Sequence, residues 1–392
     1  MSKSSPIETL NSGNTVNLLE SLMKNALRNG ANAADCLAVT GTALSVSQRL
    51  GKREDLERSE TCDIGLRVFI DKRQAIVSST DLSTRALDEL VQRALAMAKA
   101  VPEDPFCGLA DSSLLAENFK DLDLFDEHQC SAEELYERAG MAEDAARIHP
   151  GITNSEGGDA RWGQNFVTLL NSDGFIGGYK TSSHSTSVAV VAEKNDSMER
   201  DYDYSISRHL EDLRDAREIG QRAAERTVKR LNPRKAKTSQ VPVVFDPRIS
   251  GSILGHFAGA LSGPMIARGS SFLSKHLGEQ IFPKDITIID DPARIRGLGS
   301  KPFDGEGVTN KKTLLAKDGI LKSWILDSCS ARQLGLETTG HAQRGTTSVP
   351  SPSTTNLFLA AGNLSPSALV GCISSGLYVT ELIGFGVNQI TG

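Results

Sequence analysis

Long apolar runs, paired cysteines and a strong excess of either charge are all missing from this 392-residue sequence. A membrane-spanning helix needs a run of about 18 or more apolar residues, so the chain is expected not to enter a membrane. The six cysteines are widely spaced and form no C-x-x-C pair, which predicts free thiols in a reducing compartment rather than a disulfide framework or a cysteine-rich zinc site. Because residues 1–6 also lack the apolar core of a signal peptide, we expect a cytoplasmic protein.

Charge is nearly balanced, with a formal net charge of -6 from 43 basic and 49 acidic residues. The basic residues are scattered, apart from a short cluster at 229–237 that is typical of a solvated linker. A chain without a basic face is a poor candidate for nucleic-acid binding, so no nucleic-acid partner is expected. Apolar residues make up 39% of the chain and charged residues 23%, the composition of an ordinary soluble protein with two or three domains.

The first 101 residues are predicted to form a compact N-terminal domain of the αβββα type. Apolar residues recur with helical spacing at both ends of this region, and strand-like runs lie between them. The predicted order is helix 16–29, strand 35–47, strand 63–70, strand 74–78 and helix 82–101. The last two strands flank Asp71-Lys72-Arg73 and are expected to form a hairpin.

Residues 125–232 are predicted to form a central α/β domain built around a second hairpin. Asp173-Gly174 separates two strand-like runs, and Asp-Gly in that position is a strong signal for a tight turn. The predicted elements are helix 132–148, strands 166–170, 175–179 and 185–193, and helix 210–231. The polar run 234–240 is predicted to link this domain to the next.

Residues 241–392 are predicted to form a β-rich domain of the sandwich or barrel-like kind. A strand-like run at 241–245 precedes a helix at 249–261, and short β-like runs follow between many glycines and prolines. The fold class predicted for the whole chain is therefore α+β.

The helix predicted at 249–261 carries a single histidine, His256. Catalytic zinc normally takes three protein ligands, and the other histidines show no ligand spacing, so His256 is interpreted as a core or hydrogen-bonding residue. Glycines at 251, 255, 259 and 263 follow one face of this helix. The segment is too short and its flanks too polar for a membrane helix, so this face is expected to pack closely against a strand or a partner backbone.

Two acidic motifs lie in the C-terminal region, at Asp290-Asp291-Pro292 and at Asp304-Gly305-Glu306-Gly307. Paired carboxylates can perform acid–base chemistry or hold a cation. Asp before Pro and Asp before Gly are also common turn formers, and we favour that interpretation. The sequence has no phosphate-binding P-loop, no dinucleotide-binding glycine motif and no serine nucleophile elbow.

Several segments together resemble the TldD/PmbA family, whose names refer to peptidases and to a supposed modulator of DNA gyrase. The resemblance runs through most of the chain and is densest after Val241. The matching segments are RGSSF at 268–272, IIDDP at 288–292, GLGSKPFDGEG at 297–307 and GLYVTELIGFGVN at 376–388. Members usually continue beyond the point that matches Gly392, so the resemblance implies either a truncated C-terminal domain, whose cut sheet would expose an edge, or final strands that are dispensable.

The resemblance implies a two-subunit protease. One subunit of such an enzyme, TldD, carries an H-E-x-x-x-H helix with zinc, and its TldE/PmbA partner shares the fold without that motif. This chain resembles the partner, because Phe257 and Leu261 stand where the glutamate and the second histidine would follow His256. We therefore expect no catalytic residue, metal or other cofactor in this chain, zinc on a TldD-like partner, and unfolded or short peptides as substrates. Such peptides can be held by strand addition to an open sheet edge.

Six residues are predicted to line the peptide channel or the subunit interface. They are His256, Arg268, Phe303, Asp304, Glu306 and Glu381. Two alternatives stay open. The chain could be a metalloprotease active on its own through scattered ligands such as His256, His341 and Glu381, or a gyrase-regulating protein that acts through protein contacts.

Overall fold

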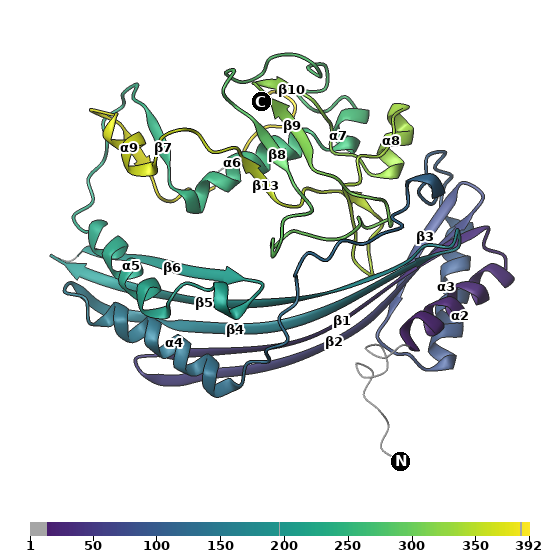
Figure 1. Ribbon diagram of the computed structural model, residues 1–392, viewed down its shortest axis with the longest axis horizontal. Helices are drawn as coiled ribbons and strands as arrows, with labels where there is room; N and C mark the ends of the chain where they lie inside the picture. Colours follow the sequence, from purple (N-terminus) through teal and green to yellow (C-terminus); the bar gives the residue numbers. More distant parts are fainter. Residues whose placement is uncertain (1–13, 196, 385) are drawn as a thin grey trace.

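The computed structural model describes residues 14–195, 197–384 and 386–392, and its main feature is one long, curved antiparallel sheet (Figure 1). Six strands form this sheet in the order β3-β2-β1-β4-β5-β6. They are β1 (Ala33–Arg49), β2 (Lys52–Ile70), β3 (Arg73–Ser79), β4 (Ile152–Asn171), β5 (Ile176–Lys194) and β6 (Ser197–Ser207). Pairing of β1 with β4 joins the strands of the first two predicted domains into a single layer.

Alternation along β1 assigns its side chains to the two faces of the sheet. Cys36 and Ala38 are buried in a core with the N-terminal helices, whereas Leu37 belongs to a different cluster on the opposite, concave face. The same alternation continues into β4, where Leu170 joins the first core and Leu169 the second. The concave face is therefore partly apolar as well, and it is this face that meets the C-terminal region.

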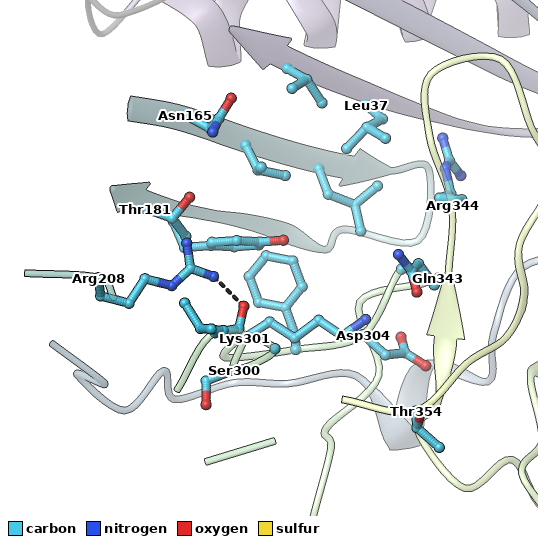
Figure 2. Close-up of a pocket in the computed structure, with 18 residues that line it drawn as sticks. Leu37, Asn165, Thr181, Arg208, Ser300, Lys301, Asp304, Gln343, Arg344 and Thr354 are labelled. Carbon is cyan, nitrogen blue, oxygen red and sulfur yellow. Dashed lines mark hydrogen bonds between the residues drawn. The ribbon is translucent and has the colours of Figure 1, made fainter. Parts of the chain in front are cut away.

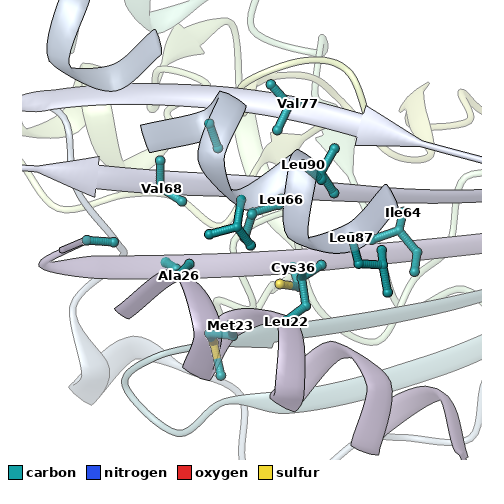
Figure 3. Packing of buried hydrophobic residues seen from close by; sticks show 14 of the residues in the cluster. Leu22, Met23, Ala26, Cys36, Ile64, Leu66, Val68, Val77, Leu87 and Leu90 are labelled. Atoms are coloured by element: carbon teal, nitrogen blue, oxygen red, sulfur yellow. The ribbon is translucent and has the colours of Figure 1, made fainter. Parts of the chain in front are cut away.

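Four helices cover the convex face of the sheet (Figure 1). They are α2 (Asn14–Arg28) and α3 (Thr84–Ala100) at one end, and α4 (Ala132–Arg147) and α5 (Ala216–Lys229) at the other. Leu22, Leu66 and Leu90 lie in the core between the first pair and the strands (Figure 3). The start of α4 is fixed by a capping box, in which Ser131 and Glu134 bond each other's backbone N–H groups.

The C-terminal region lies above the concave face in Figure 1 and contains short elements joined by long loops. Its helices are α6 (Pro247–Ala260), α7 (Gly263–Ala267), α8 (Ser328–Leu334) and α9 (Pro366–Gly371). Its strands are β7 (Val243–Phe245), β8 (Ile288–Asp290), β9 (Thr313–Lys317), β10 (Ile320–Leu321), β11 (Ala342–Gln343), β12 (Ser351–Pro352), β13 (Leu357–Leu359) and β14 (Leu377–Val379). They form a sheet in the order β10-β9-β8-β13 and two further pairs, β11-β12 and β14-β7. Single 3-10 turns lie at Ser112–Leu114 and Leu210–Asp212.

The predicted αβββα unit is confirmed, and so are both predicted hairpins. The strands are longer than predicted. The first part of β2, at 52–61, is exposed and polar, so it carries no apolar alternation by which it could be recognised. The strand predicted at 185–193 is the continuation of β5, and β6 was missed because its buried side chains include the aspartates Asp201 and Asp203.

The helix predicted at 210–231 begins only at Ala216, where the side chain of Asp215 caps its first turn. A sandwich or barrel in the C-terminal region was the wrong expectation. The strands described there are two to five residues long, and their apolar residues pack with helices and loops, as Leu315 and Trp324 do with Leu261 after α6. No helix among the described residues has both the length and the apolar content needed to cross a membrane.

Candidate functional site

A cavity of about 460 Å³ lies between the concave face of the sheet and loops of the C-terminal region (Figure 2). Its apolar wall comes from β1 and β4, with Leu37, Val167 and Leu169 among its residues. The loop at 298–305 and the segment that begins at β11 close the other sides. Asn165, which also lines the cavity, is exposed, so the space is open to solvent.

Phe303 anchors the loop against the sheet. Its side chain is 2% exposed, and its ring lies 5.1 Å from that of Phe175 and 5.5 Å from that of Tyr179, centroid to centroid. The close approach requires a glycine on β5, since a Cβ at Gly177 would lie 2.8 Å from the Phe303 ring. The aromatic cluster therefore fixes the position of the loop that carries the neighbouring acidic residues.

Asp304 and Glu306 are both buried behind this loop. The Asp304 carboxylate accepts hydrogen bonds from the backbone N–H groups of Glu306, Val308 and Ala342, at 2.9, 2.9 and 3.0 Å. Two of these bonds close the local turn, so the turn interpretation of this motif is confirmed. Burial, followed by the nearby charge of Glu306, raises the pKa of Asp304 to about 7, against the opposing effect of the backbone hydrogen bonds. Burial likewise raises the pKa of Glu306, an effect that Arg67 partly offsets.

A buried ionic group joins this loop region to the sheet. Asp35 of β1 accepts hydrogen bonds from Arg67 Nε at 2.8 Å and from an Arg344 guanidinium nitrogen at 2.5 Å. All three side chains are at most 3% exposed. Burial alone would raise the pKa of Asp35, but the charges and hydrogen bonds of Arg344 and Arg67 outweigh it and lower that pKa.

Four charged residues are among those around the cavity, the cationic Arg208, Lys301 and Arg344 and the acidic Asp304. Arg208 donates to the carbonyl oxygens of Ser182, at 2.9 Å, and Leu298. Lys301 Nζ donates to the carbonyl oxygen of residue 342 at 3.3 Å, and burial lowers the pKa of this lysine. Figure 2 shows Arg208 and Arg344 on opposite sides of the cavity, with the Lys301 side chain extending toward Asp304.

The structure brings three of the six predicted site residues together. Phe303 and Asp304 line the cavity, and Glu306, two residues on, accepts a hydrogen bond from the Ser328 N–H at 2.9 Å. The other three lie on separate elements outside this cavity. His256 is half-buried on α6, Arg268 is exposed after α7, and Glu381 is exposed after β14, where it pairs with Arg230 at 2.7 Å.

Sequence reasoning missed Asp35, Arg67 and Arg344. The first two carried a usable signal, because each is a charged residue inside an otherwise apolar strand, as Arg67 is between Leu66 and Val68. A charge in such a position is almost always paired. Arg344 follows a two-residue strand and has no such pattern around it.

Helix α6 is the place where a family-type zinc motif would lie, and its side chains do not fit a metal. Phe257 is 8% exposed and packs against Phe282 with ring centroids 5.3 Å apart, while Leu261 is fully buried. Both belong to the apolar core of the C-terminal region. Within the described ranges, no group of three or more His, Cys, Asp or Glu side chains is arranged to hold a metal ion.

Three of the four glycines lie on α6, whereas Gly263 begins α7. A Cβ at Gly263 would lie 2.2 Å from Ser330 Oγ, and one at Gly259 would lie 3.5 Å from Gln389 Nε2. A Cβ at Gly251 or Gly255 would meet no atom of the described chain within 4 Å outside its own helix backbone. The close packing predicted for this face is therefore not made within the described chain at its first two glycines.

His341 is buried, and its side chain contacts a residue of β8. Its Nε2 lies 3.3 Å from Asp290 Oδ2, and Asp290 also accepts hydrogen bonds of 2.7 Å from the N–H and hydroxyl groups of Thr355. These contacts tie β8 to the segment before β13. They place His341 on a different element from α6, which carries His256.

A second cluster has the residue types of a cysteine protease but not the chemistry. Cys130 Sγ lies 3.6 Å from His184 Nδ1, and His184 Nε2 lies 3.1 Å from Asp126 Oδ2. Burial raises the pKa of the Cys130 thiol and lowers that of His184 to about 4. The thiol is thus protonated at neutral pH, and with Cys130 only 5% exposed it is not an available nucleophile.

Comparison with known proteins identifies the family. Residues 34–98, 126–231 and 238–392 match the first, central and C-terminal domains of the PmbA/TldA metallopeptidases. Metalloprotease PmbA of Escherichia coli O157:H7 is 40% identical over 379 residues, covering 96% of this chain and 82% of that protein. A TldD homolog from Haemophilus influenzae is 30% identical over 172 residues, 43% of this chain and 36% of that protein. The chain therefore belongs to the PmbA/TldD family of metalloproteases.

Solved structures share the fold along nearly the whole chain. A candidate modulator of DNA gyrase from Bacteroides thetaiotaomicron superposes with a TM-score of 0.89 at 25% identity, over 97% of this chain and 85% of the other. TldE from Thermococcus kodakarensis superposes with a TM-score of 0.83 at 21% identity, over 94% and 83%. The latter likeness concerns the fold alone.

Proposed function

We propose that this chain is the non-catalytic, TldE/PmbA-type subunit of a two-subunit peptidase whose zinc is held by a TldD-like partner. One observation carries the proposal. Phe257 and Leu261, at the positions of the glutamate and second histidine of the zinc motif, are buried in an apolar core. Replacing packed apolar side chains by ligands would require the core itself to change, so this helix is built for packing rather than for metal binding.

The concave face of the sheet supports peptide binding as the contribution of this subunit. Farther along the same strands lies a row of small residues outside the cavity, where Ala43 pairs with Gly163 and Gly163 pairs with Ser183. Ala43 is exposed and Ser183 is half-buried. Small side chains next to an open cavity leave room for an extended peptide, which would be a short or unfolded one.

The assembly would work in the cytoplasm. The six cysteines, all within the described part of the chain, are free thiols, which supports a reducing compartment. The rival hypothesis of a protease active on its own has less support, because His341 is paired with Asp290 and Glu381 with Arg230. A gyrase-binding role stays a prediction, and capture of gyrase in the absence of any TldD-like protein would favour it.

A peptidase assay of three samples tests the proposal: this chain alone, the TldD-like subunit of the same cell alone, and an equimolar mixture. We expect hydrolysis of unfolded peptides only in the mixture, with sensitivity to a chelator. Chelator-sensitive hydrolysis by this chain alone would contradict the proposal. The variant His256→Ala, assayed in the same way, controls for metal chemistry on α6.

A further inference from the structure

One edge of the long sheet has no partner strand over much of its length. β3 pairs with β2 only from Ile64 to Ile70, so within the described chain no strand pairs with residues 52–63 on that side. Figure 1 shows β3 alongside only the end of β2 that lies near α2 and α3. Residues 52–61 are exposed. Because alternate residues of an antiparallel strand turn their N–H and C=O groups to opposite sides, every second residue here directs its donor and acceptor away from β1.

The side chains on the concave side of this edge are acidic. Val39 of β1 lines the cavity and pairs with Asp63, so the odd-numbered residues from 55 to 63 face the concave side. Three of them, Asp55, Glu57 and Asp63, are carboxylates that form no ion pair or side-chain hydrogen bond within the described chain. Asp55 and Glu57 are exposed and Asp63 is half-buried, so this negative charge can be reached by a ligand.

The basic residues of the same stretch do not cancel this charge. Residues 52–63 contain five acidic and three basic side chains. Two of the basic ones are already paired, Arg53 with Glu133 of α4 and Arg58 with Glu60 at 3.0 Å. The edge therefore presents unpaired backbone groups beside a net negative charge.

The charge decides which kind of strand fits this edge. Antiparallel pairing of two copies of the chain about Ser59 would place Asp55 opposite Asp63, and like charges in that position are destabilising. An acidic segment would meet the same repulsion. An extended segment with basic residues at alternate positions would instead form opposite-charge pairs with the same carboxylates.

We infer that residues 52–63 of β2 bind a basic, extended peptide as an added edge strand, with lysine or arginine side chains next to Asp55, Glu57 and Asp63. The assignment rests on the proposed peptide-binding function and names the class of peptide and the place where it binds. In strand addition the main-chain hydrogen bonds hold any extended segment, whereas the side chains along the edge select among sequences.

Two blocked peptides of alternating residues, acetyl-KTKTKTKTK-amide and acetyl-ETETETETE-amide, test the inference in calorimetric titrations of the full chain. We expect the lysine peptide to bind at least about tenfold more tightly than the glutamate peptide, because its cross-strand pairs are attractive rather than repulsive. Added salt should reduce the difference, since the charges are exposed. Hydrogen–deuterium exchange of the amides in 52–63 should slow when the lysine peptide is bound.

Variants of the carboxylates test their part in the preference. The double variant Asp55→Asn, Glu57→Gln should weaken binding of the lysine peptide by about fivefold, because two attractive cross-strand pairs are lost. The matched control is Glu137→Gln, Glu225→Gln, which removes two exposed carboxylates from α4 and α5 on the convex face and should leave binding unchanged. Thermal midpoints recorded in parallel establish that both variants are folded.

Equal affinities for the two peptides, absence of binding by both, or binding without slower exchange in 52–63 would each overturn the inference. So would dimerisation of the chain that protects the same amides. Assembly of the parent chain with the TldD-like subunit is measured separately. Loss of the lysine preference with assembly intact refutes only the edge-strand site, whereas absence of assembly refutes the proposed function.

Discussion

Asp35 and Arg344 lie 309 residues apart in the chain, and their side chains meet in a buried hydrogen bond of 2.5 Å between β1 and the segment after β11. The same carboxylate binds Arg67 on the adjacent strand. One acidic group thus pairs with two buried cations and ties the C-terminal region to the sheet. This contact and the packing of Phe303 against Phe175 both join loops of the C-terminal region to the sheet beside the cavity.

Removal of this carboxylate should destabilise the fold strongly. Asp35→Ala leaves Arg67 and Arg344 buried without their partner, and breaking a buried pair in this way costs about 3–5 kcal/mol. Urea unfolding monitored by tryptophan fluorescence measures the loss. Glu133→Ala, which breaks the exposed pair with Arg53, is the control and should leave the midpoint unchanged. Equal effects of the two substitutions would show that the buried pair does not hold the regions together.

The acidic loop predicts a pH dependence of stability. The ordinary pKa of an aspartate is 3.8, and in the folded chain burial raises that of Asp304 to about 7. The folded state therefore retains a proton that the unfolded state loses, and the resulting stabilisation is complete at low pH and disappears as pH rises from about 4 to about 7. The difference in unfolding free energy between Asp304→Asn and the parent chain should accordingly change in favour of the variant across this range. A pH-independent difference would contradict the raised pKa.

Restoring the zinc motif on α6 should damage the fold rather than create a metal site. Phe257→Glu and Leu261→His each place a polar group in the apolar core of the C-terminal region. We expect each to lower the free energy of unfolding by about 2–5 kcal/mol, from lost packing and a buried polar group. Thermal unfolding with and without added zinc measures this. A double variant that binds zinc tightly and stays as stable as the parent chain would show that the helix is a zinc site with altered ligands.

Substitution by alanine should change the stability of the chain in opposite directions at Gly65, which is packed under a loop, and at Gly255, which is not. A Cβ at Gly65 would lie 2.3 Å from the carbonyl oxygen of Thr346, so Gly65→Ala should be destabilising because the loop must move off the sheet. Gly255→Ala, in the interior of α6, meets no atom within 4 Å and should stabilise the chain by up to about 1 kcal/mol. Thermal midpoints of both variants decide the matter, and a shift in the same direction for both would contradict the packing described.

The parts of the fold that could be predicted from the sequence are those with a periodic pattern of apolar residues. Alternation in β3 and β5 and the helical spacing of α3 reflect burial of one face, so they survive in the residue types. The first half of β2 pairs with β1 through backbone hydrogen bonds while its side chains stay in solvent, and such pairing leaves no mark on composition. The buried aspartates of β6 are paired with arginines of two helices: Arg226 of α5 lies 2.8 Å from Asp203, and Arg248 of α6 lies 2.8 Å from Asp201.

In the candidate site, too, burial could be predicted from residue type, whereas contacts between distant segments could not. Phe257 and Leu261 are apolar where ligands would stand, and that residue type alone foretold their burial. The Asp304 and Glu306 motif was recognised, but its neighbour Arg344 is brought there by tertiary contacts between segments far apart in sequence. Glu381 was grouped with them on sequence resemblance, whereas the structure pairs it with Arg230 after α5.

The most direct test of the proposed role is co-purification of this chain with a TldD-like protein from the same cell, followed by counting of zinc on each separated subunit. We predict a stable complex in which about one zinc per complex stays with the TldD-like subunit and none with this chain. One tightly held zinc on the pure chain, or a chain that forms no complex and cleaves peptides by itself, would contradict the account.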